Sequence, residues 1–286
     1  MPEVRIIALD LDGTLLDSDK RLTNANRAAL QKAADAGIEI VPATGRFFAG
    51  MPEEVRDLPF LHYAVTVNGA QVYDIRNDRA IYRAEIPQRL ALEIMEYLDD
   101  FPLIYDCYME NWGWMSENLW EIAGDFAPNE HYRKLLRDYR RPVPELKAHL
   151  RERGGDVQKI SLYVKDMALH AQLMEELPRR FPETEVTSSI WNNIEINDKS
   201  ANKGEALLRL AAYLGCGAAE TVAFGDGLND LSMIRKAGIG VAMANSHPDV
   251  LAAADHVTGD CDRDGVAAGI EALCFPETNE MKRGNE

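Results

Sequence analysis

Short apolar stretches alternate with helical ones near both ends of this 286-residue chain, and no other feature restricts the fold as much. The first part predicts three strands and one helix; the strands are VRIIALD (4–10), IEIVPATGR (38–46) and YAVTVNGA (63–70), and the helix is LTNANRAALQKAADAG (22–37). Thr23 is the expected N-cap of that helix and Gly37 its terminator. Apolar strands separated by helices are typical of a parallel sheet with helices on both faces.

The C-terminal part repeats this pattern. Helices are predicted at 202–215, 229–238, 247–255 and 264–274, and strands at 221–227, 239–245 and 256–258. The middle is less regular and contains an alternating strand, KISLYVKD (159–166), among expected hairpins and helices. We therefore expect an α/β fold: a doubly wound, Rossmann-like core formed by residues 1–83 and 200–286, with an α+β domain, residues 84–199, inserted into it.

The composition limits the class of protein. Apolar residues make up 46% and charged residues 27%, as in soluble globular proteins. No apolar run approaches the roughly 20 residues of a membrane span, and no secretory signal is evident, so the cytoplasm is the expected compartment. The net charge of −16 argues against a nucleic-acid partner. The four scattered cysteines (Cys107, Cys216, Cys261 and Cys274) argue against a disulfide scaffold or zinc site.

Two acids follow the first predicted strand, in IIALDLDGTLLD (6–17). Asp10 and Asp12 are two residues apart, so we expect their side chains to project to the same side of the strand end. Ligands bind at the carboxyl ends of strands in open α/β sheets. Neighbouring carboxylates repel, which suits a nucleophile or metal ligand beside a general acid/base. A pair of turn-forming acids before Gly13 is the alternative.

Two further polar clusters follow predicted strands or begin helices. Thr44, Gly45 and Arg46 offer a hydroxyl and backbone amides that suit phosphate binding, although such a loop is also routine. Lys203 begins a helix, where the macrodipole disfavours a cation. An anionic partner, either a phosphate or Asp10, would resolve that conflict, whereas the alternative is a surface lysine.

The predicted strand at 221–227 ends in a dense group of polar residues. The group comprises Gly225, Asp226, Gly227, Asn229 and Asp230. Oxygen ligands at this density suit Mg²⁺, which takes few carboxylates and keeps several waters. A Gly-Asp turn with Asn229 capping the next helix explains only one or two of these residues.

Together these clusters resemble the haloacid dehalogenase (HAD) superfamily. DLDGT (10–14) is similar to its first motif, Thr44 in ATGR to its second, Lys203 in NKG to its third and GDGLND (225–230) to its fourth. The accessory stretches VTVNGA, VAMAN and DGVAAGIE resemble the Cof-type phosphatase subfamily. The resemblance covers most of residues 4–82 and 200–273.

The resemblance implies a role for each motif residue. Asp10 would attack phosphorus and become a transient aspartyl-phosphate. Asp12 would protonate the leaving oxygen and then activate water. Thr44 would bind the phosphoryl oxygens, and Lys203 would neutralise charge and orient Asp10.

The resemblance also implies a magnesium site and further phosphate contacts. Mg²⁺ would be held by Asp10, the backbone carbonyl of Asp12 and Asp226, with Asp230 in support behind these ligands or bonded to Lys203. The remaining phosphate-binding residues would be Gly45, Arg46 and Asn229.

The inserted segment corresponds to the family's cap, which would exclude water and select the leaving group. Its stretch YDCYMENWGWMSENLW (105–120) contains Trp112, Trp114 and Trp120. A packed hairpin with its following helix is the favoured interpretation, ahead of an aromatic specificity surface or a dimer contact. Asn193 and Glu195 alternate with Asn197 in the last strand of the cap, so they are candidate substrate contacts.

The leading hypothesis is a Mg²⁺-dependent phosphatase for a small phosphorylated metabolite, such as a sugar phosphate or a phosphorylated cofactor. The alternatives are a phosphomutase resembling phosphomannomutase and a non-catalytic phosphate-binding or phosphoacceptor protein. No nucleic-acid or membrane partner is expected. The expected state is a monomer or a weak homodimer formed through the cap.

Overall fold

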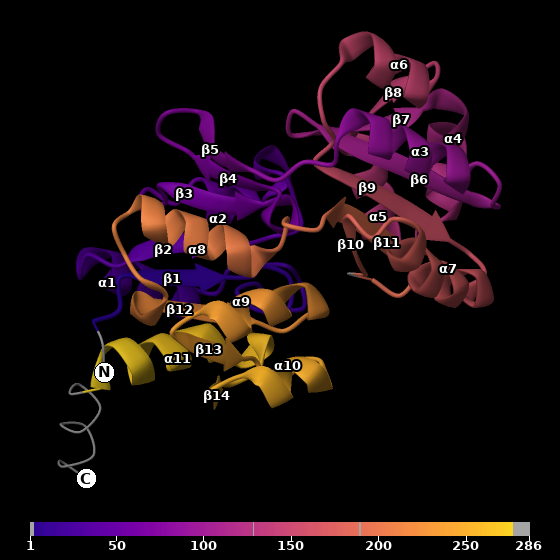
Figure 1. Ribbon diagram of the computed structural model, residues 1–286. Helices are drawn as coiled ribbons and strands as arrows, with labels where there is room; N and C mark the ends of the chain where they lie inside the picture. Colours follow the sequence, from indigo (N-terminus) through magenta and orange to yellow (C-terminus); the bar gives the residue numbers. More distant parts are fainter. Residues whose placement is uncertain (1–2, 128, 189, 277–286) are drawn as a thin grey trace. The chain divides into compact units, whose positions relative to one another are not determined.

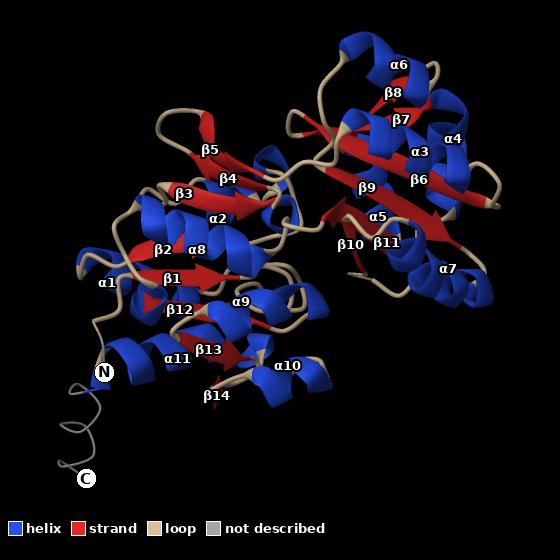
Figure 2. Ribbon diagram, in the orientation of Figure 1, coloured by secondary structure: helices blue, strands red, loops and turns tan. Residues whose placement is uncertain are grey.

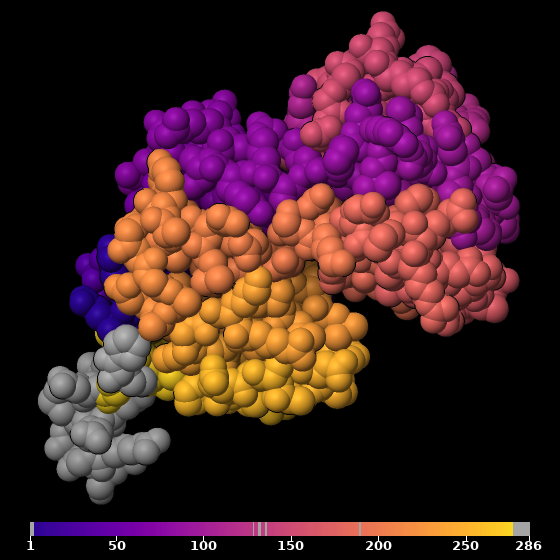
Figure 3. All heavy atoms as spheres, in the orientation of Figure 1, coloured from indigo at the N-terminus to yellow at the C-terminus, as the bar shows by residue number. Residues whose placement is uncertain are grey.

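The computed structural model describes residues 3–127, 129–188 and 190–276 (Figure 1). The chain forms two compact units. The first consists of Met1–Tyr82 and Asn202–Glu286, and the second of Arg83–Ala201. In the space-filling view, the orange and yellow atoms of the C-terminal segment lie directly against the indigo and purple atoms of the N-terminal segment (Figure 3). Two segments distant in sequence therefore build the first unit together.

The first unit contains a five-stranded parallel sheet in the order β14-β13-β12-β1-β2 (Figure 2). Its strands are β1 (Ile6–Leu9), β2 (Glu39–Pro42), β12 (Thr221–Gly225), β13 (Ile239–Ala242) and β14 (His256–Val257). The expected fold class is therefore confirmed. Because β1 pairs with both β12 and β2, the residues that follow it lie at the middle of the sheet edge.

Helices cover both faces of this sheet. They are α1 (Asn24–Asp35), α2 (Glu53–Arg56), α8 (Lys203–Tyr213), α9 (Leu231–Lys236), α10 (Pro248–Ala253) and α11 (Gly265–Cys274). Alternate β1 residues explain the layering, because Ile7 packs with α1 and α11 while Ile6 packs with α8 and α9. Thr23 caps α1 as expected, accepting a hydrogen bond from the Asn26 amide (3.1 Å). Gly37 follows the helix with φ +85°.

The third predicted strand (63–70) does not form a full strand of the parallel sheet. A separate antiparallel sheet contains β3 (Tyr63–Thr66), β4 (Gln71–Asp74) and β5 (Arg79–Arg83). A single parallel bridge, between Ala43 and Val65, connects β3 to the end of β2. On its other edge β3 pairs antiparallel with β4, so the two strands form a hairpin.

The second unit is built on a six-stranded sheet in the order β10-β11-β9-β6-β7-β8. Its strands are β6 (Leu103–Met109), β7 (Trp112–Ser116), β8 (Arg140–Val143), β9 (Lys159–Val164), β10 (Thr184–Thr187) and β11 (Asn193–Asp198). Its helices are α3 (Gln88–Leu98), α4 (Glu117–Ile122), α5 (Glu130–Asp138), α6 (Leu146–Arg153) and α7 (Met167–Arg180). One face of the sheet packs its apolar side chains against α3, α6 and α7.

The tryptophan-rich stretch forms the β6–β7 hairpin and α4, as the favoured interpretation predicted. Trp114 stacks on His149 with ring centroids 4.6 Å apart, and Arg141 lies 3.8 Å over the ring of Trp112. Within the part of the chain that the structure describes, no helix is both long and apolar enough to cross a membrane.

Candidate active site

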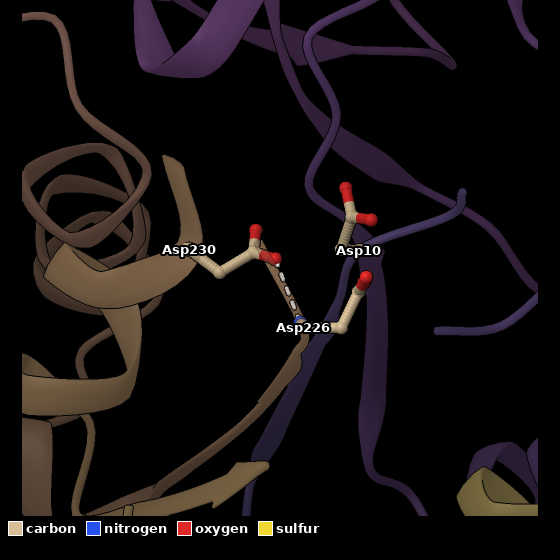
Figure 4. A group of neighbouring side chains, drawn as sticks. All are labelled: Asp10, Asp226 and Asp230. Atoms are coloured by element: carbon tan, nitrogen blue, oxygen red, sulfur yellow. Dashed lines mark hydrogen bonds between the residues drawn. The ribbon is translucent and has the colours of Figure 1, made fainter. Parts of the chain in front are cut away.

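Three aspartates meet at one edge of the parallel sheet (Figure 4). Asp10 follows β1 and Asp226 follows the adjacent strand β12, so the sheet itself brings them together. Asp230 belongs to the short 3-10 helix Leu228–Asp230 that comes next. One oxygen from each carboxylate lies within 4.8 Å of the other two. The sequence cluster at the end of β12 is therefore a cluster in space that includes Asp10.

Lys203 is the first residue of α8 and its side chain is 0% exposed. Its Nζ donates to Oδ1 of Asp10 and to Oδ1 of Asp230, both at 2.6 Å. Burial alone would lower the pKa of Lys203, but the two carboxylates outweigh it and raise the pKa above its ordinary value. The surface-lysine alternative is therefore wrong, because the side chain is buried. The two carboxylates offset the unfavourable interaction of the ammonium with the helix dipole.

Asp230 connects this lysine to the loop after β12. While its Oδ1 accepts from Lys203, its Oδ2 accepts from the backbone amides of Asp226 and Gly227, each at 2.9 Å. Gly225 makes room for it, since a Cβ there would lie 2.5 Å from the Asp230 Cβ. Asp230, rather than Asn229, provides the side-chain bond at the start of this short helix.

The three acids carry more negative charge than Lys203 neutralises. Burial raises the pKa of Asp10 well above its ordinary value; Asp230 and Asp226 add to the effect, and Lys203 only partly offsets it. Burial and the charge of Asp230 raise the pKa of Asp226 to about 6. With every acid ionised, three carboxylates face one ammonium, an excess of two negative charges. A small divalent cation fits both this excess and the hard oxygen ligands.

Thr14 orients the carboxylate of Asp226. Its hydroxyl donates to Oδ1 of Asp226 at 2.7 Å. The turn before it requires Gly13, which has φ +92° and whose Cβ would lie 2.6 Å from Oδ2 of Asp226. Asn245 holds the same turn by donating to the Gly13 carbonyl at 2.8 Å.

Asp12 has partners different from those of Asp10. Arg46 binds its carboxylate through two hydrogen bonds, of 2.9 and 3.0 Å, and Lys20 lies 3.2 Å away. Burial alone would raise the pKa of Asp12, but these two cations hold it below its ordinary value. Thr44 is buried next to this pair, and its Oγ1 accepts from the Arg46 backbone amide at 3.2 Å.

The other predicted phosphate-binding residues converge on Asn68. Asn229 donates from Nδ2 to Oδ1 of Asn68 at 3.3 Å. A Cβ on Gly45 would lie 2.7 Å from the same oxygen. Asn68 adopts a left-handed conformation, φ +58°, just after β3. Asn68, Thr14 and Lys20 were not predicted as site residues from the sequence. The available signal for Asn68 was an Asn-Gly pair directly after a strand.

The structure places Asn193 and Glu195 on β11, in the second unit. Both are buried, and Oε1 of Glu195 accepts from Nζ of Lys159 (3.0 Å) and from Nδ2 of Asn193 (3.3 Å). Asn193 and Glu195 therefore belong to a buried polar network with Lys159. Their contact with substrate stays a prediction.

Comparison with known proteins decides the family. Residues 7–270 match the haloacid dehalogenase-like hydrolases. The chain belongs to this family and is a hydrolase. The 5-amino-6-(5-phospho-D-ribitylamino)uracil phosphatase YcsE of Bacillus subtilis is 29% identical over 272 residues, covering 94% of this chain and 95% of that protein. The pyridoxal phosphate phosphatase YbhA of Escherichia coli is 29% identical over 269 residues, covering 93% and 97%.

A solved structure gives the same assignment. A haloacid dehalogenase-like hydrolase from Bacillus subtilis is similar with a TM-score of 0.81 at 27% identity, covering 94% of this chain and all of that one (100%). The resemblance noted in the sequence is thus confirmed, and the family members it matches by name are phosphatases.

Proposed function

We propose that this hydrolase is a Mg²⁺-dependent phosphatase that removes phosphate from a small phosphorylated metabolite through an aspartyl-phosphate on Asp10. The observation that supports it best is the hydrogen bond from Nζ of Lys203 to Oδ1 of Asp10, which is 2.6 Å long. This bond lies within a cluster of three carboxylates. A buried carboxylate held by a fixed ammonium is a positioned nucleophile. Lys203 also offers positive charge for the phosphoryl group that Asp10 would attack.

In the first step, an Asp10 oxygen bonds to phosphorus and the bond from phosphorus to the leaving oxygen breaks. Asp12 gives its proton to that oxygen. The hydroxyl of Thr44, with Gly45 and Asn229, binds the phosphoryl oxygens. In the second step, a water oxygen attacks phosphorus, Asp12 takes a proton from the water, and the bond to Asp10 breaks.

Arg46 connects these two steps. Its hydrogen bonds favour the ionised form of Asp12, which suits the base of the second step but not the acid of the first. We infer that Arg46 exchanges Asp12 for the phosphate when substrate binds. Burial would then raise the pKa of Asp12 and favour the protonated acid.

The metal site proposed here uses the excess charge of the cluster. Asp10, Asp226 and the backbone carbonyl of Asp12 would hold Mg²⁺, while Asp230 stays bonded to Lys203 and the loop amides. When bound, Mg²⁺ would neutralise charge on the phosphoryl oxygens. Thr14 keeps Asp226 in the orientation that this role needs.

The second unit is proposed to be the cap that selects the substrate. The two relatives differ in the substrate that their names give, a ribitylamino-uracil phosphate and pyridoxal phosphate, at the same identity to this chain. Sequence identity to the two relatives therefore does not indicate which of the two substrates this protein uses. The common feature is a phosphate on a small polar organic molecule, and that is the substrate class proposed.

The test is phosphate release from p-nitrophenyl phosphate with and without Mg²⁺, comparing wild type with Asp10→Asn. We expect sustained turnover by the wild type, its loss with EDTA, and a fall of roughly 10⁴-fold or more in the variant. Equal activity of wild type and variant would refute the mechanism. Conversion of a hexose 6-phosphate to its 1-phosphate without phosphate release would instead identify a mutase.

A further inference from the structure

Lys20 is the second cation at the Asp12 carboxylate, besides Arg46. Its Nζ lies 3.2 Å from Oδ1 of Asp12, and the two side chains are 35% and 34% exposed. Asp12, Lys20 and Arg46 all belong to the first unit. The arrangement of these three side chains is therefore complete within that unit.

The backbone of Lys20 has an uncommon conformation. Its φ is +64°, in the left-handed region that glycine and asparagine adopt most readily. Two backbone hydrogen bonds close the turn around it, from the Lys20 amide to the Asp17 carbonyl (2.9 Å) and from the Asp17 amide to the Arg21 carbonyl (3.0 Å). The Ser18 amide donates to Oδ1 of Asp262 at 2.8 Å, which connects the turn to the segment before α11. A long charged side chain at a position that suits glycine indicates a role for that side chain.

The two cations bind the oxygens of Asp12 unequally. Nε of Arg46 donates to Oδ2 at 2.9 Å and its Nη2 to Oδ1 at 3.0 Å, whereas Lys20 contacts Oδ1 only. Among the described residues, Oδ2 has no hydrogen-bond partner besides Arg46. Lys20 precedes α1 and Arg46 follows β2, so one cation can leave the carboxylate while the other stays. When Arg46 moves to the phosphate, Oδ2 becomes free and Oδ1 remains bonded to Lys20.

Proton transfer by Asp12 needs this difference between its two oxygens. A protonated carboxyl carries its proton on one oxygen and accepts hydrogen bonds at the other. An ammonium only donates, so Lys20 can stay at Oδ1 while the proton is on Oδ2. Once that proton has moved to the leaving oxygen, the same contact holds the carboxylate and leaves Oδ2 available to take a proton from water.

We propose that Lys20 is a positioning residue that fixes Oδ1 of Asp12, so that Oδ2 gives the proton to the leaving oxygen and later takes one from water. This inference rests on the proposed function, because it takes Asp12 to be the acid and base of a phosphatase. Lys20 acts through Asp12 alone. Its effect should therefore grow with the leaving group's need for a proton.

The test compares phenyl phosphate with p-nitrophenyl phosphate, which have the same shape except for the nitro group. Phenolate is a much stronger base than p-nitrophenolate, so it has a greater need for the proton when it leaves. The value of kcat/KM covers the steps up to the aspartyl-phosphate and therefore reports the acid role of Asp12. In Lys20→Asn, which suits the left-handed backbone, kcat/KM for phenyl phosphate should fall about tenfold or more. That for p-nitrophenyl phosphate should change less than about twofold.

Two further variants of the same turn serve as controls. Lys20→Arg keeps a long cationic side chain and should bring the ratio of the two kcat/KM values to within about threefold of the wild-type ratio. Arg21→Gln removes a cation one residue further along, from a side chain that is 68% exposed and pairs with Asp19. It should leave both values unchanged.

Equal falls of kcat/KM for the two substrates in Lys20→Asn would overturn the inference, because a general effect on phosphate binding or folding lowers both. Unchanged values for both substrates would also overturn it. Failure of the proposed function is distinguishable, because the wild type would then release no phosphate from either substrate and the inference would fall with it. Turnover by the wild type with an unchanged ratio in Lys20→Asn would overturn the inference alone.

Discussion

Nζ of Lys203 lies 2.6 Å from Oδ1 of Asp230, and neither side chain is exposed. Because the same ammonium also holds Asp10, its removal leaves two buried carboxylates without their cation. We expect Lys203→Met to lower the free energy of unfolding by about 3–5 kcal/mol and to reduce turnover at least ~100-fold. Urea denaturation and phosphate release measure the two effects.

The matched control for this variant is Lys32→Met. Lys32 pairs with Glu271 at 2.7 Å, but both side chains are more than a third exposed. A pair of this kind contributes about 0–1 kcal/mol. Similar losses of stability in the two variants would contradict the importance given to the buried lysine.

A second prediction concerns the metal ligands. Asp226→Asn removes one charge from the cluster without changing its shape, so the Mg²⁺ concentration for half-maximal activity should rise more than ~100-fold. Thr14→Val removes only the hydrogen bond that orients Asp226, and a shift of roughly tenfold is expected. A titration of activity with Mg²⁺ checks both. If Asp226→Asn reached half-maximal activity at the same Mg²⁺ concentration as the wild type, Asp226 would be excluded as a metal ligand.

The structure also makes a prediction for a residue without a side chain. A Cβ at position 225 would lie 2.5 Å from the Cβ of Asp230, so Gly225→Ala displaces the residue that positions Lys203. The expected cost is about 1–3 kcal/mol of stability, together with a loss of turnover. Gly217→Ala is the control, since its Cβ would meet only Oε2 of Glu220, at 3.6 Å. Thermal unfolding should separate the two variants clearly.

The strands of the parallel sheet and the positions where its central strands end could be predicted from the sequence, because local sequence patterns indicate both. Apolar runs such as that before Asp10 give way at once to acids, and Thr23 precedes its helix in the position of an N-cap. The residues alone narrowed the partner of Lys203 to an anion, either a phosphate or Asp10, and only the family resemblance implied contacts with both Asp10 and Asp230. Which anion depends on the distance between α8 and the loop after β12, and no local pattern encodes that distance.

Contacts between distant segments account for most of what was missed. Asn68 and Asn229 are 161 residues apart, and neither one's neighbours indicate the other. The second unit poses the same problem, because Arg140 and Lys159 resemble surface charges in the sequence. Their burial makes sense only with Asp106 and Glu195 on neighbouring strands.

The last prediction separates the two proposed roles of Asp12. The p-nitrophenolate ion is a weak base and leaves without a proton, so Asp12→Asn should still transfer phosphate to Asp10 from p-nitrophenyl phosphate. Release of that phosphate needs the base and should slow at least ~100-fold. Rapid-mixing measurements should therefore show a burst of p-nitrophenol close to one per active site, followed by slow turnover.

An alkyl phosphate should give no burst with the same variant, because its leaving oxygen needs the proton that Asp12 would supply. Asp17→Asn is the control, since Asp17 bonds to the Arg21 amide at the surface and should keep wild-type kinetics. The absence of a burst with p-nitrophenyl phosphate, combined with slow turnover, would show that formation of the aspartyl-phosphate has become the slow step. That result would contradict the prediction that Asp12 is needed only for the second step with this leaving group.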